Sequence, residues 1–168
     1  MILKNHPEQC EPGLADSMSF SMSDWSIHVA SWRDYTHLSQ LERACFPAED
    51  LWPFWDLIGV LTLPGIVRLK ALVGEQMVGF IAGERDLETR IGWVTTLGVM
   101  PEHRRLGIAL ALLAACERDL DMPIIRLSVR ESNRAAICLY EGQGYAIINR
   151  WKKYYVGGED ALVFEKRR

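Results

Sequence analysis

Residues 97–110 of this chain read LGVMPEHRRLGIAL, and this stretch decides the fold. An apolar strand ends at Val99, a basic turn carries Arg104 and Arg105, and a helix opens at Gly107. The N–H groups that begin a helix carry partial positive charge, and a glycine there lets a phosphate approach the backbone closely. The two arginines add charge-assisted contacts to phosphate oxygens. The stretch therefore predicts a pyrophosphate cradle at this turn and helix start.

Two other phosphate-binding patterns do not fit these residues. A Walker A loop requires Gly-Lys followed by Ser or Thr, which this turn lacks. A dinucleotide fingerprint requires three glycines at G-x-G-x-x-G spacing, which is also missing here. On these residues alone, an ordinary helix start flanked by surface arginines explains the stretch as well as a phosphate cradle does.

The rest of the chain alternates strands and helices around this stretch. Hydrophobic spacing predicts strands at 27–30, 66–73, 77–83, 93–99, 124–129, 145–151 and 161–164, and helices at 32–46, 51–61, 106–120 and 133–141. We expect one mixed α/β domain over residues 25–168, preceded by a disordered lead-in of residues 1–24. The second helix is rich in aromatic residues, and we expect at least two of Trp52, Phe54 and Trp55 to fill the core.

Composition excludes several classes of protein. Of 168 residues, 49% are hydrophobic and 24% charged, which is typical of a soluble globular domain. The longest apolar run, residues 108–116, is far shorter than the ~20 residues of a membrane span. The net charge of −3 argues against nucleic acid as a partner. The four cysteines form no C-x-x-C pair and the histidines no H-x-x-x-H pair, so we expect no metal, no disulfide framework and a cytoplasmic location.

A second block supports a resemblance to a known family. RRLGIA at residues 104–109 resembles the (Q/R)-x-x-G-x-(G/A) acyl-CoA motif of the GNAT superfamily of N-acetyltransferases, and LGVMP at 97–101 resembles the strand before that motif. LSVRESNRAAICLYEGQGY at 127–145 resembles the family block L-x-V-x-x-x-N-x-x-A-x-x-L-Y-x-x-x-G-(F/Y). With YYVGGEDA at 154–161, the chain is most similar to the ribosomal-protein alanine N-acetyltransferase branch.

The resemblance implies a mostly antiparallel sheet of six to seven strands with a central splay, flanked by about four helices. It also implies acetyl-CoA as co-substrate. The backbone of Leu97 and Val99 would bind the pantetheine arm, and the helix opening at Gly107 would bind the pyrophosphate. The complete set of implied coenzyme contacts is Leu97, Gly98, Val99, Arg104, Arg105, Leu106, Gly107, Ile108, Ala109, Leu110, Asn133 and Tyr140.

Three further roles follow from the resemblance, each with a structural alternative. Tyr140 matches the family tyrosine that protonates the departing coenzyme A thiolate, and its alternative is a core aromatic residue. Asn133 matches a pantetheine contact, but it also suits the N-cap of the helix that follows it. Tyr154 and Tyr155 resemble the pair that lines the acceptor groove, and in a strand one of the two would point into the core.

The general base is not evident, because Ser128 stands where the alanine-acetylating branch has a glutamate. Glu84 or Glu88 could act through water, although surface-facing acids are the simpler interpretation. Freeing an α-amine at pH 7 costs roughly 3.5 kcal/mol less than freeing a lysine amine, because their pKa values are about 7.7–8.0 and 10.4. A site without a strong base should therefore prefer N-terminal or weakly basic small amines.

The sequence thus predicts an acetyl-CoA-dependent N-acetyltransferase in which a primary amine attacks the thioester directly within a ternary complex. The expected acceptor is a peptide or protein N-terminal amine. A small-molecule acetyltransferase for polyamines or antibiotics, an enzyme with a longer or amino-acid acyl donor, and a non-catalytic acyl-CoA-binding regulatory module are the alternatives. We expect neither a membrane nor nucleic acid as partner, and the residues leave open whether the chain forms a homodimer.

Overall fold

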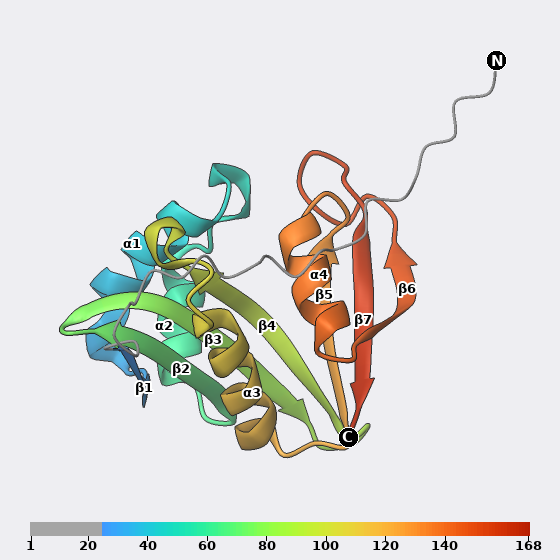
Figure 1. Cartoon of the computed structure of the whole chain (residues 1–168), viewed down its shortest axis with the longest axis horizontal. Helices are drawn as coiled ribbons and strands as arrows, with labels where there is room; N and C mark the ends of the chain where they lie inside the picture. Colours follow the sequence, from blue (N-terminus) through green and yellow to red (C-terminus); the bar gives the residue numbers. More distant parts are fainter. Residues whose placement is uncertain (1–24) are drawn as a thin grey trace, which may run out of the picture.

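One seven-stranded sheet runs through residues 25–168, the part of the chain that the computed structural model describes (Figure 1). The expected lead-in of residues 1–24 lies outside the described residues. The strand order is β1-β2-β3-β4-β5-β7-β6, and within this sheet β4 and β5 are parallel while the other neighbours are antiparallel. The strands are β1 (Trp25–Val29), β2 (Ile66–Val73), β3 (Gln76–Asp86), β4 (Ile91–Val99), β5 (Ile124–Arg130), β6 (Ala146–Trp151) and β7 (Ala161–Arg167).

Four α-helices accompany the sheet within these residues, as the hydrophobic spacing predicts. They are α1 (Tyr35–Cys45), α2 (Phe54–Thr62), α3 (Ile108–Leu120) and α4 (Arg134–Gly142), and short 3₁₀ turns lie at Trp32–Asp34 (η1), Ala48–Asp50 (η2) and Pro101–His103 (η3). α2 starts three residues later than expected, because Pro53 disfavours helical backbone at the residue before it. No helix among residues 25–168 has the length and hydropathy needed to cross a bilayer.

The helices cover the two faces of the sheet unequally. α3 and α4 pack on one face, which we call the α3 face, where Leu112 and Tyr140 meet strand residues such as Ile81 in a continuous core. α1 and α2 cover the other face, the α1 face, over β2–β4, where Leu38 and Phe80 belong to a second core. Alternate residues of a strand point to opposite faces, so Phe80 and Ile81 of β3 serve the two cores.

The aromatic residues at the start of α2 do not fill the core as expected. Phe54 is 48% exposed and Trp55 is 76% exposed, and Trp52 alone among the three packs against the α1-face core. The buried side of α2 is made by Leu57 and its neighbours in the following turn. Trp55 lies two residues before Leu57, about 200° around the helix axis, so it projects away from the core.

The sheet opens at its centre, where the two halves diverge. β4 pairs with β5 only from Ile91 to Val94 in the described structure, and a register shift in the β3–β4 ladder leaves Thr95 as a bulged residue. The Thr95 hydroxyl donates to the carbonyl oxygen of Ala82 at 3.2 Å. Beyond this point β4 follows β3 and β5 follows β7, so a V-shaped gap separates the two strands (Figure 1). The predicted central splay is confirmed.

Candidate active site

The edge of β4 that faces the gap carries backbone groups without a strand partner. The N–H of Met100 donates to the carbonyl oxygen of Val78 at 2.9 Å, and Gly98 pairs with Phe80 in the same register. Because alternate residues of an antiparallel strand bond to the same neighbour, the N–H and C=O groups of Leu97 and Val99 point away from β3. They face the gap on the β5 side, where β5 no longer pairs with β4 and an extended ligand could pair instead.

The turn after β4 leads to an open helix N-terminus. Gly107 is the N-cap of α3 with φ +79°, a left-handed conformation that favours glycine. The first hydrogen bond of the helix runs from the N–H of Ala111 to the carbonyl oxygen of Gly107 at 3.0 Å. The N–H groups of residues 108–110 therefore have no acceptor within the helix. A Cβ on Gly107 would meet no protein atom within 4 Å, so the approach to these N–H groups is open.

The two arginines of the turn lie in different settings. The guanidinium of Arg104 donates from Nε to the carbonyl oxygen of Val99 at 3.1 Å and also contacts the Cys45 thiol at the end of α1. Arg104 thus ties the turn to β4 and α1, a structural role that the sequence did not predict. Arg105 is exposed and has φ +64°, which keeps the turn in an unusual backbone conformation.

Tyr140 lies on the buried side of α4 with its ring against two other aromatic rings. The ring centroids of Tyr145 and Phe164 are 5.8 and 5.9 Å away, and Tyr140 is 7% exposed. Burial, with a smaller contribution from nearby Tyr155, raises the pKa of the Tyr140 hydroxyl well above its usual value. No residue among 25–168 hydrogen-bonds to that hydroxyl. It therefore remains protonated at neutral pH.

Tyr155 brings a second hydroxyl to the α1 face of the splay. Its hydroxyl is hydrogen-bonded to that of Ser128 on β5, and the guanidinium of Arg130 lies over its ring at 4.3 Å from the centroid. Burial raises the pKa of Tyr155, while Ser128 and Arg130 act in the opposite direction. Tyr154 is 55% exposed, and both tyrosines lie in the loop between β6 and β7 rather than in a strand.

Arg130 joins three segments around this face, and we call the group the Arg130 clasp. Its guanidinium binds both carboxylate oxygens of Asp50 in η2 at 2.6 and 2.7 Å, and one carboxylate oxygen of Glu159 in the β6–β7 loop at 2.7 Å. Hydrogen bonds from Ser132 and the charge of Arg130 lower the pKa of Glu159 to about 2. The clasp fixes the β6–β7 loop, and with it Tyr155, relative to the α1–α2 connection.

Further aromatic side chains extend this surface beyond the residues found from the sequence. The rings of Trp93 on β4 and Trp151 on β6 stack at 6.0 Å, and Trp151 contacts Tyr154 at 5.1 Å. Arg126 lies over Trp93 and is paired with Glu165 at 2.8 Å. The sequence did not point to Trp93, Arg126 or Arg130. A signal for the two arginines was present, because Arg126, Ser128 and Arg130 are every second residue of β5 and such residues lie on one face of a sheet.

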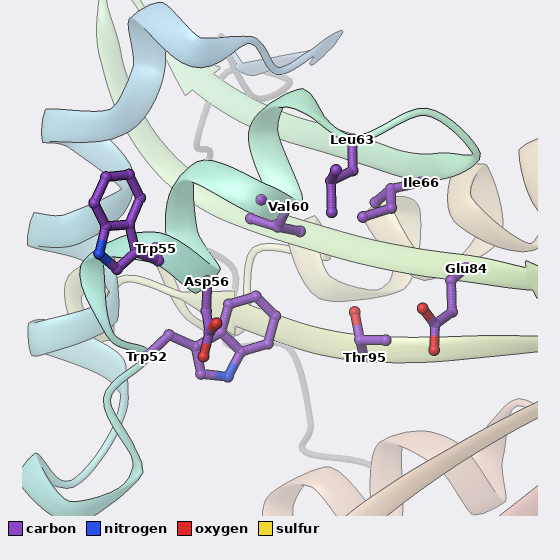
Figure 2. Close-up of a pocket in the computed structure, with 9 residues that line it drawn as sticks. Trp52, Trp55, Asp56, Val60, Leu63, Ile66, Glu84 and Thr95 are labelled. Atoms are coloured by element: carbon purple, nitrogen blue, oxygen red, sulfur yellow. The ribbon is translucent and has the colours of Figure 1, made fainter.

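A pocket of about 340 Å³ lies between α2 and the strands on the α1 face. Figure 2 shows Trp52, Asp56, Thr95 and Glu84 along one side of it. Glu84 on β3 stands opposite Trp93 on β4. Of the two candidate bases, Glu84 lines this pocket, whereas Glu88 lies in the β3–β4 turn, at the end of β4 remote from Val99.

Asn133 occupies the structural position that was one of its two predicted roles. It is the N-cap of α4, and its side-chain oxygen accepts from the N–H of Ala136 at 3.2 Å. The contact with pantetheine stays a prediction. Among residues 25–168, no group of three His, Cys, Asp or Glu side chains is arranged to hold a metal ion.

Comparison with known proteins agrees with this geometry. Residues 26–145 match the Acetyltransferase (GNAT) family. The catalytic subunit NAA10 of the N-terminal acetyltransferase A complex of Arabidopsis thaliana is 33% identical over 147 residues, covering 83% of this chain and 76% of NAA10. An N-alpha-acetyltransferase of Saccharolobus solfataricus is 29% identical over 157 residues, covering 85% of this chain and 93% of the relative.

Two solved structures show the same fold. The ribosomal-protein-S18-alanine N-acetyltransferase of Escherichia coli superposes with a TM-score of 0.76 at 22% identity, covering 85% of this chain and 93% of the other. Naa50 of Arabidopsis thaliana, solved with a bisubstrate analogue, superposes with a TM-score of 0.72 at 24% identity, covering 87% and 100%. With the family match spanning most of the chain, the protein belongs to the GNAT acetyltransferase family.

Proposed function

We propose that the protein transfers the acetyl group of acetyl-CoA to the α-amine at the N-terminus of a peptide or protein. The main support is that the unpaired edge of β4 at Leu97 and Val99 is followed, after one turn, by the open N-terminus of α3. The relatives named above, N-terminal and N-alpha-acetyltransferases, support an N-terminal acceptor.

The donor half of the site follows from the backbone. The amides of the pantetheine arm would pair with the N–H and C=O of Leu97 and with the N–H of Val99 as an added strand does, while the C=O of Val99 accepts from Arg104. The pyrophosphate would lie against the N–H groups of residues 108–110, with Arg105 free to reach it and Arg104 holding the turn in place. Acetyl-CoA supplies the activated acyl group, and the protein supplies its orientation.

The chemistry needs one attack and one departure. The neutral amine nitrogen forms a bond to the thioester carbonyl carbon, the carbon–sulfur bond of the tetrahedral intermediate then breaks, and the nitrogen gives up one proton to water as the amide forms. Tyr140 would donate a hydrogen bond or a proton to the leaving sulfur, and its raised pKa, which keeps the hydroxyl protonated, supports this role. Backbone N–H groups near Leu97 and Val99 would stabilise the intermediate oxyanion.

In the acceptor half, Ser128 and Tyr155 carry hydroxyl groups, which are weak bases, and Glu84 could act as a base only through water. An α-amine is partly neutral near pH 7.5, whereas a lysine amine is almost entirely protonated. The site should therefore use N-terminal amines in preference to lysine side chains. Small amines, including polyamines and aminoglycosides, are the alternative acceptors that the same surface leaves accessible.

The test is release of coenzyme A thiol with acetyl-CoA as donor. Peptides with a free N-terminus are compared with the same peptides carrying a blocked N-terminus and one internal lysine, and with polyamines and aminoglycosides. We expect the free-terminus peptides to react fastest. Faster reaction of internal lysines or of small amines would contradict the proposed acceptor, and thiol release with none of them would contradict the proposed activity.

A further inference from the structure

The closed end of the gap between β4 and β5 lies where the proposed reaction would take place. Val94 and Leu127 form the last pair of the β4–β5 ladder, so Ser128 is the first residue of β5 beyond it. The proposed pyrophosphate site at Gly107 follows the opposite end of this part of β4, which is Val99. A coenzyme arm that enters there and runs back along β4 therefore brings its thioester toward Ser128.

Ser128 and Tyr140 lie on opposite faces of the sheet beside this gap. Leu127 and Val129 of β5 belong to the α3-face core, and so does Tyr140. Because alternate residues of a strand point to opposite faces, the hydroxyl of Ser128 lies on the α1 face. A thioester at the closed end of the gap would therefore meet Tyr140 on one side and Ser128 on the other.

The hydroxyl of Tyr155 connects Ser128 to solvent. The two hydroxyls are hydrogen-bonded, and Ser128 is the donor, since this contact lowers the pKa of Tyr155. Tyr155 is only half-buried, so its own O–H can donate to water. It also interacts electrostatically with the Tyr140 hydroxyl, which places it beside the same gap. Ser128 and Tyr155 thus form a continuous path of hydroxyl groups from the gap to the surface.

Both the backbone and the ring of Tyr155 are held in place. Its N–H donates to the carbonyl oxygen of Glu159 at 3.1 Å, and its carbonyl oxygen accepts from the N–H of Gly158 at 2.9 Å. The guanidinium of Arg130 lies over the ring at 4.3 Å from its centroid. A positive charge there favours negative charge on the hydroxyl oxygen as a proton moves, which makes Tyr155 a better proton carrier than a free phenol.

The two carboxylates beside Tyr155 are engaged by Arg130. Its guanidinium binds Asp50 at 2.6 and 2.7 Å and Glu159 at 2.7 Å. A carboxylate in such an ion pair is a poor proton acceptor, and the pKa of Glu159 is about 2. Neither carboxylate is therefore a ready base for the amine, whereas the hydroxyl path leads from the gap itself.

We propose that Ser128 and Tyr155 form a proton relay that carries the amine proton from the reacting nitrogen to water. The inference rests on the proposed function, because it takes the position of the thioester from it. One N–H bond of the adduct breaks as its proton goes to Ser128 Oγ, the Ser128 proton goes to Tyr155 Oη, and the Tyr155 proton goes to water. Each hydroxyl gains one proton and gives up one, so both end neutral.

The first test removes each hydroxyl alone, with a free-terminus peptide as acceptor. We expect Tyr155→Phe and Ser128→Ala to lower kcat about tenfold to a hundredfold and to leave KM for acetyl-CoA unchanged. Positioned proton transfer contributes about 10²–10⁴-fold, and water can partly replace a missing hydroxyl. Ser128→Thr keeps a hydroxyl and should keep most of the rate. Tyr35→Phe on α1 is the matched control, because the half-buried rings of Tyr35 and Tyr155 each lie 5.1 Å from an aromatic neighbour.

The decisive test is whether the two hydroxyls act together. Ser128→Glu supplies a carboxylate that can take the amine proton directly, so adding Tyr155→Phe to it should change kcat by less than about twofold. A Tyr155 that only supports the fold would instead cost the same factor in both backgrounds. The kcat of Ser128→Glu should also fall at low pH as the new carboxylate is protonated, a titration that Ser128 does not have.

Three results would overturn the relay. The first is an unchanged kcat in Tyr155→Phe, including the case in which only KM for the peptide rises. The second is a Ser128→Thr variant as slow as Ser128→Ala, and the third is an equal effect of Tyr155→Phe in the two backgrounds. Each of these leaves thiol release by the unmodified protein intact. If the unmodified protein acetylates no acceptor, the proposed function fails and the relay fails with it.

Discussion

At the scale of single residues, Tyr140 is a core aromatic residue and a candidate proton donor at the same time. Its ring packs against Tyr145 and Phe164, while its hydroxyl has no hydrogen-bond partner among residues 25–168. The two roles that the sequence offers as alternatives are thus compatible, because the ring serves the core and the hydroxyl is left for a ligand. The resemblance identifies the residue, and the packing shows how it is held.

Replacing Tyr140 by phenylalanine separates these roles. We expect Tyr140→Phe to lower kcat by about 10²–10⁴-fold, as loss of a general acid does, and to leave the free energy of unfolding nearly unchanged. Tyr145→Phe is the matched control, since the Tyr145 hydroxyl donates to the buried carboxylate of Glu117 at 2.8 Å. That variant should lose about 1–3 kcal/mol of stability with little change in kcat. Unchanged kcat in Tyr140→Phe would remove the assigned role.

Gly107 should matter for the coenzyme more than for the fold. Gly107→Ala places a Cβ in open space at φ +79°, so we expect a stability loss of about 1–2 kcal/mol from backbone strain. Because the proposed pyrophosphate site begins at this residue, we expect the added Cβ and the strained backbone to lower the affinity for acetyl-CoA at least tenfold. Gly74→Ala in the β2–β3 hairpin, with φ +58° and equally open space, carries similar strain and should keep full affinity. Calorimetry and denaturant titration of both variants check this.

Candidate site residues can be found from the sequence where they belong to a contiguous motif. They cannot be found where only the folded chain brings them together. Leu97, Gly107 and Tyr140 belong to two contiguous blocks that a reader can match by eye. Trp93 and Arg130 belong to the same surface, but they meet the β6–β7 loop only through the register of the sheet and a long-range ion pair. No local pattern in the sequence contains that information.

At the scale of elements, the Arg130 clasp joins segments that are distant in the chain. We expect Arg130→Gln to cost about 1–3 kcal/mol of stability, because a half-buried guanidinium loses two carboxylate partners and leaves them unpaired. It should also raise KM for the acceptor peptide, since Tyr155 loses the cation over its ring. Arg150→Gln is the control, because the Arg150 pairs are half exposed and worth about 0–1 kcal/mol. Equal losses in the two variants would show that the clasp is an ordinary surface contact.

The clasp also makes stability depend on pH. The pKa of Glu159 is about 2 in the folded protein and about 4.5 ordinarily, so the folded state favours its charged form. This contribution is fully present above about pH 4.5 and is lost as the pH falls toward 2. Urea titrations at pH 6, 4 and 3 should show the stability gap between the protein and Glu159→Gln shrinking as the pH falls. A gap that stays constant or widens would contradict the assignment.

Helices and strands were predicted within one to three residues because their periodicity is local and their ends carry prolines and glycines. The side of a helix that becomes buried is harder to predict when several faces are apolar. α2 shows this, since its most aromatic residues, Phe54 and Trp55, are exposed while aliphatic residues such as Leu57 are buried. The splay needed the resemblance, because nothing in β4 alone indicates where its pairing with β5 stops.

At the scale of the whole molecule, the two halves of the sheet are held together by a short parallel ladder. β4 and β5 pair over four residues, from Ile91 to Val94, before they separate. A ligand that occupies the gap would add hydrogen bonds along β4 and contacts to both halves. We expect acetyl-CoA at 100 times its Kd to stabilise the fold by about 2.7 kcal/mol, which thermal denaturation measures as a rise in Tm.

The same measurement on Gly107→Ala provides the control for this effect. Its Tm in the absence of ligand should be slightly lower, and the rise on adding the same concentration of acetyl-CoA should be smaller than in the unmodified protein. An identical rise in both proteins would place the ligand elsewhere on the molecule.

The gap between β4 and β5 has a consequence for the cell as well as for catalysis. If the coenzyme completes the sheet, then the metabolic supply of activated acetate protects the chain from unfolding and from the proteases that remove unfolded chains. A shortage of that metabolite would lower the amount of folded enzyme and would also lower the rate of each remaining molecule. A gap that evolved to admit a substrate would thereby couple protein turnover to nutrition.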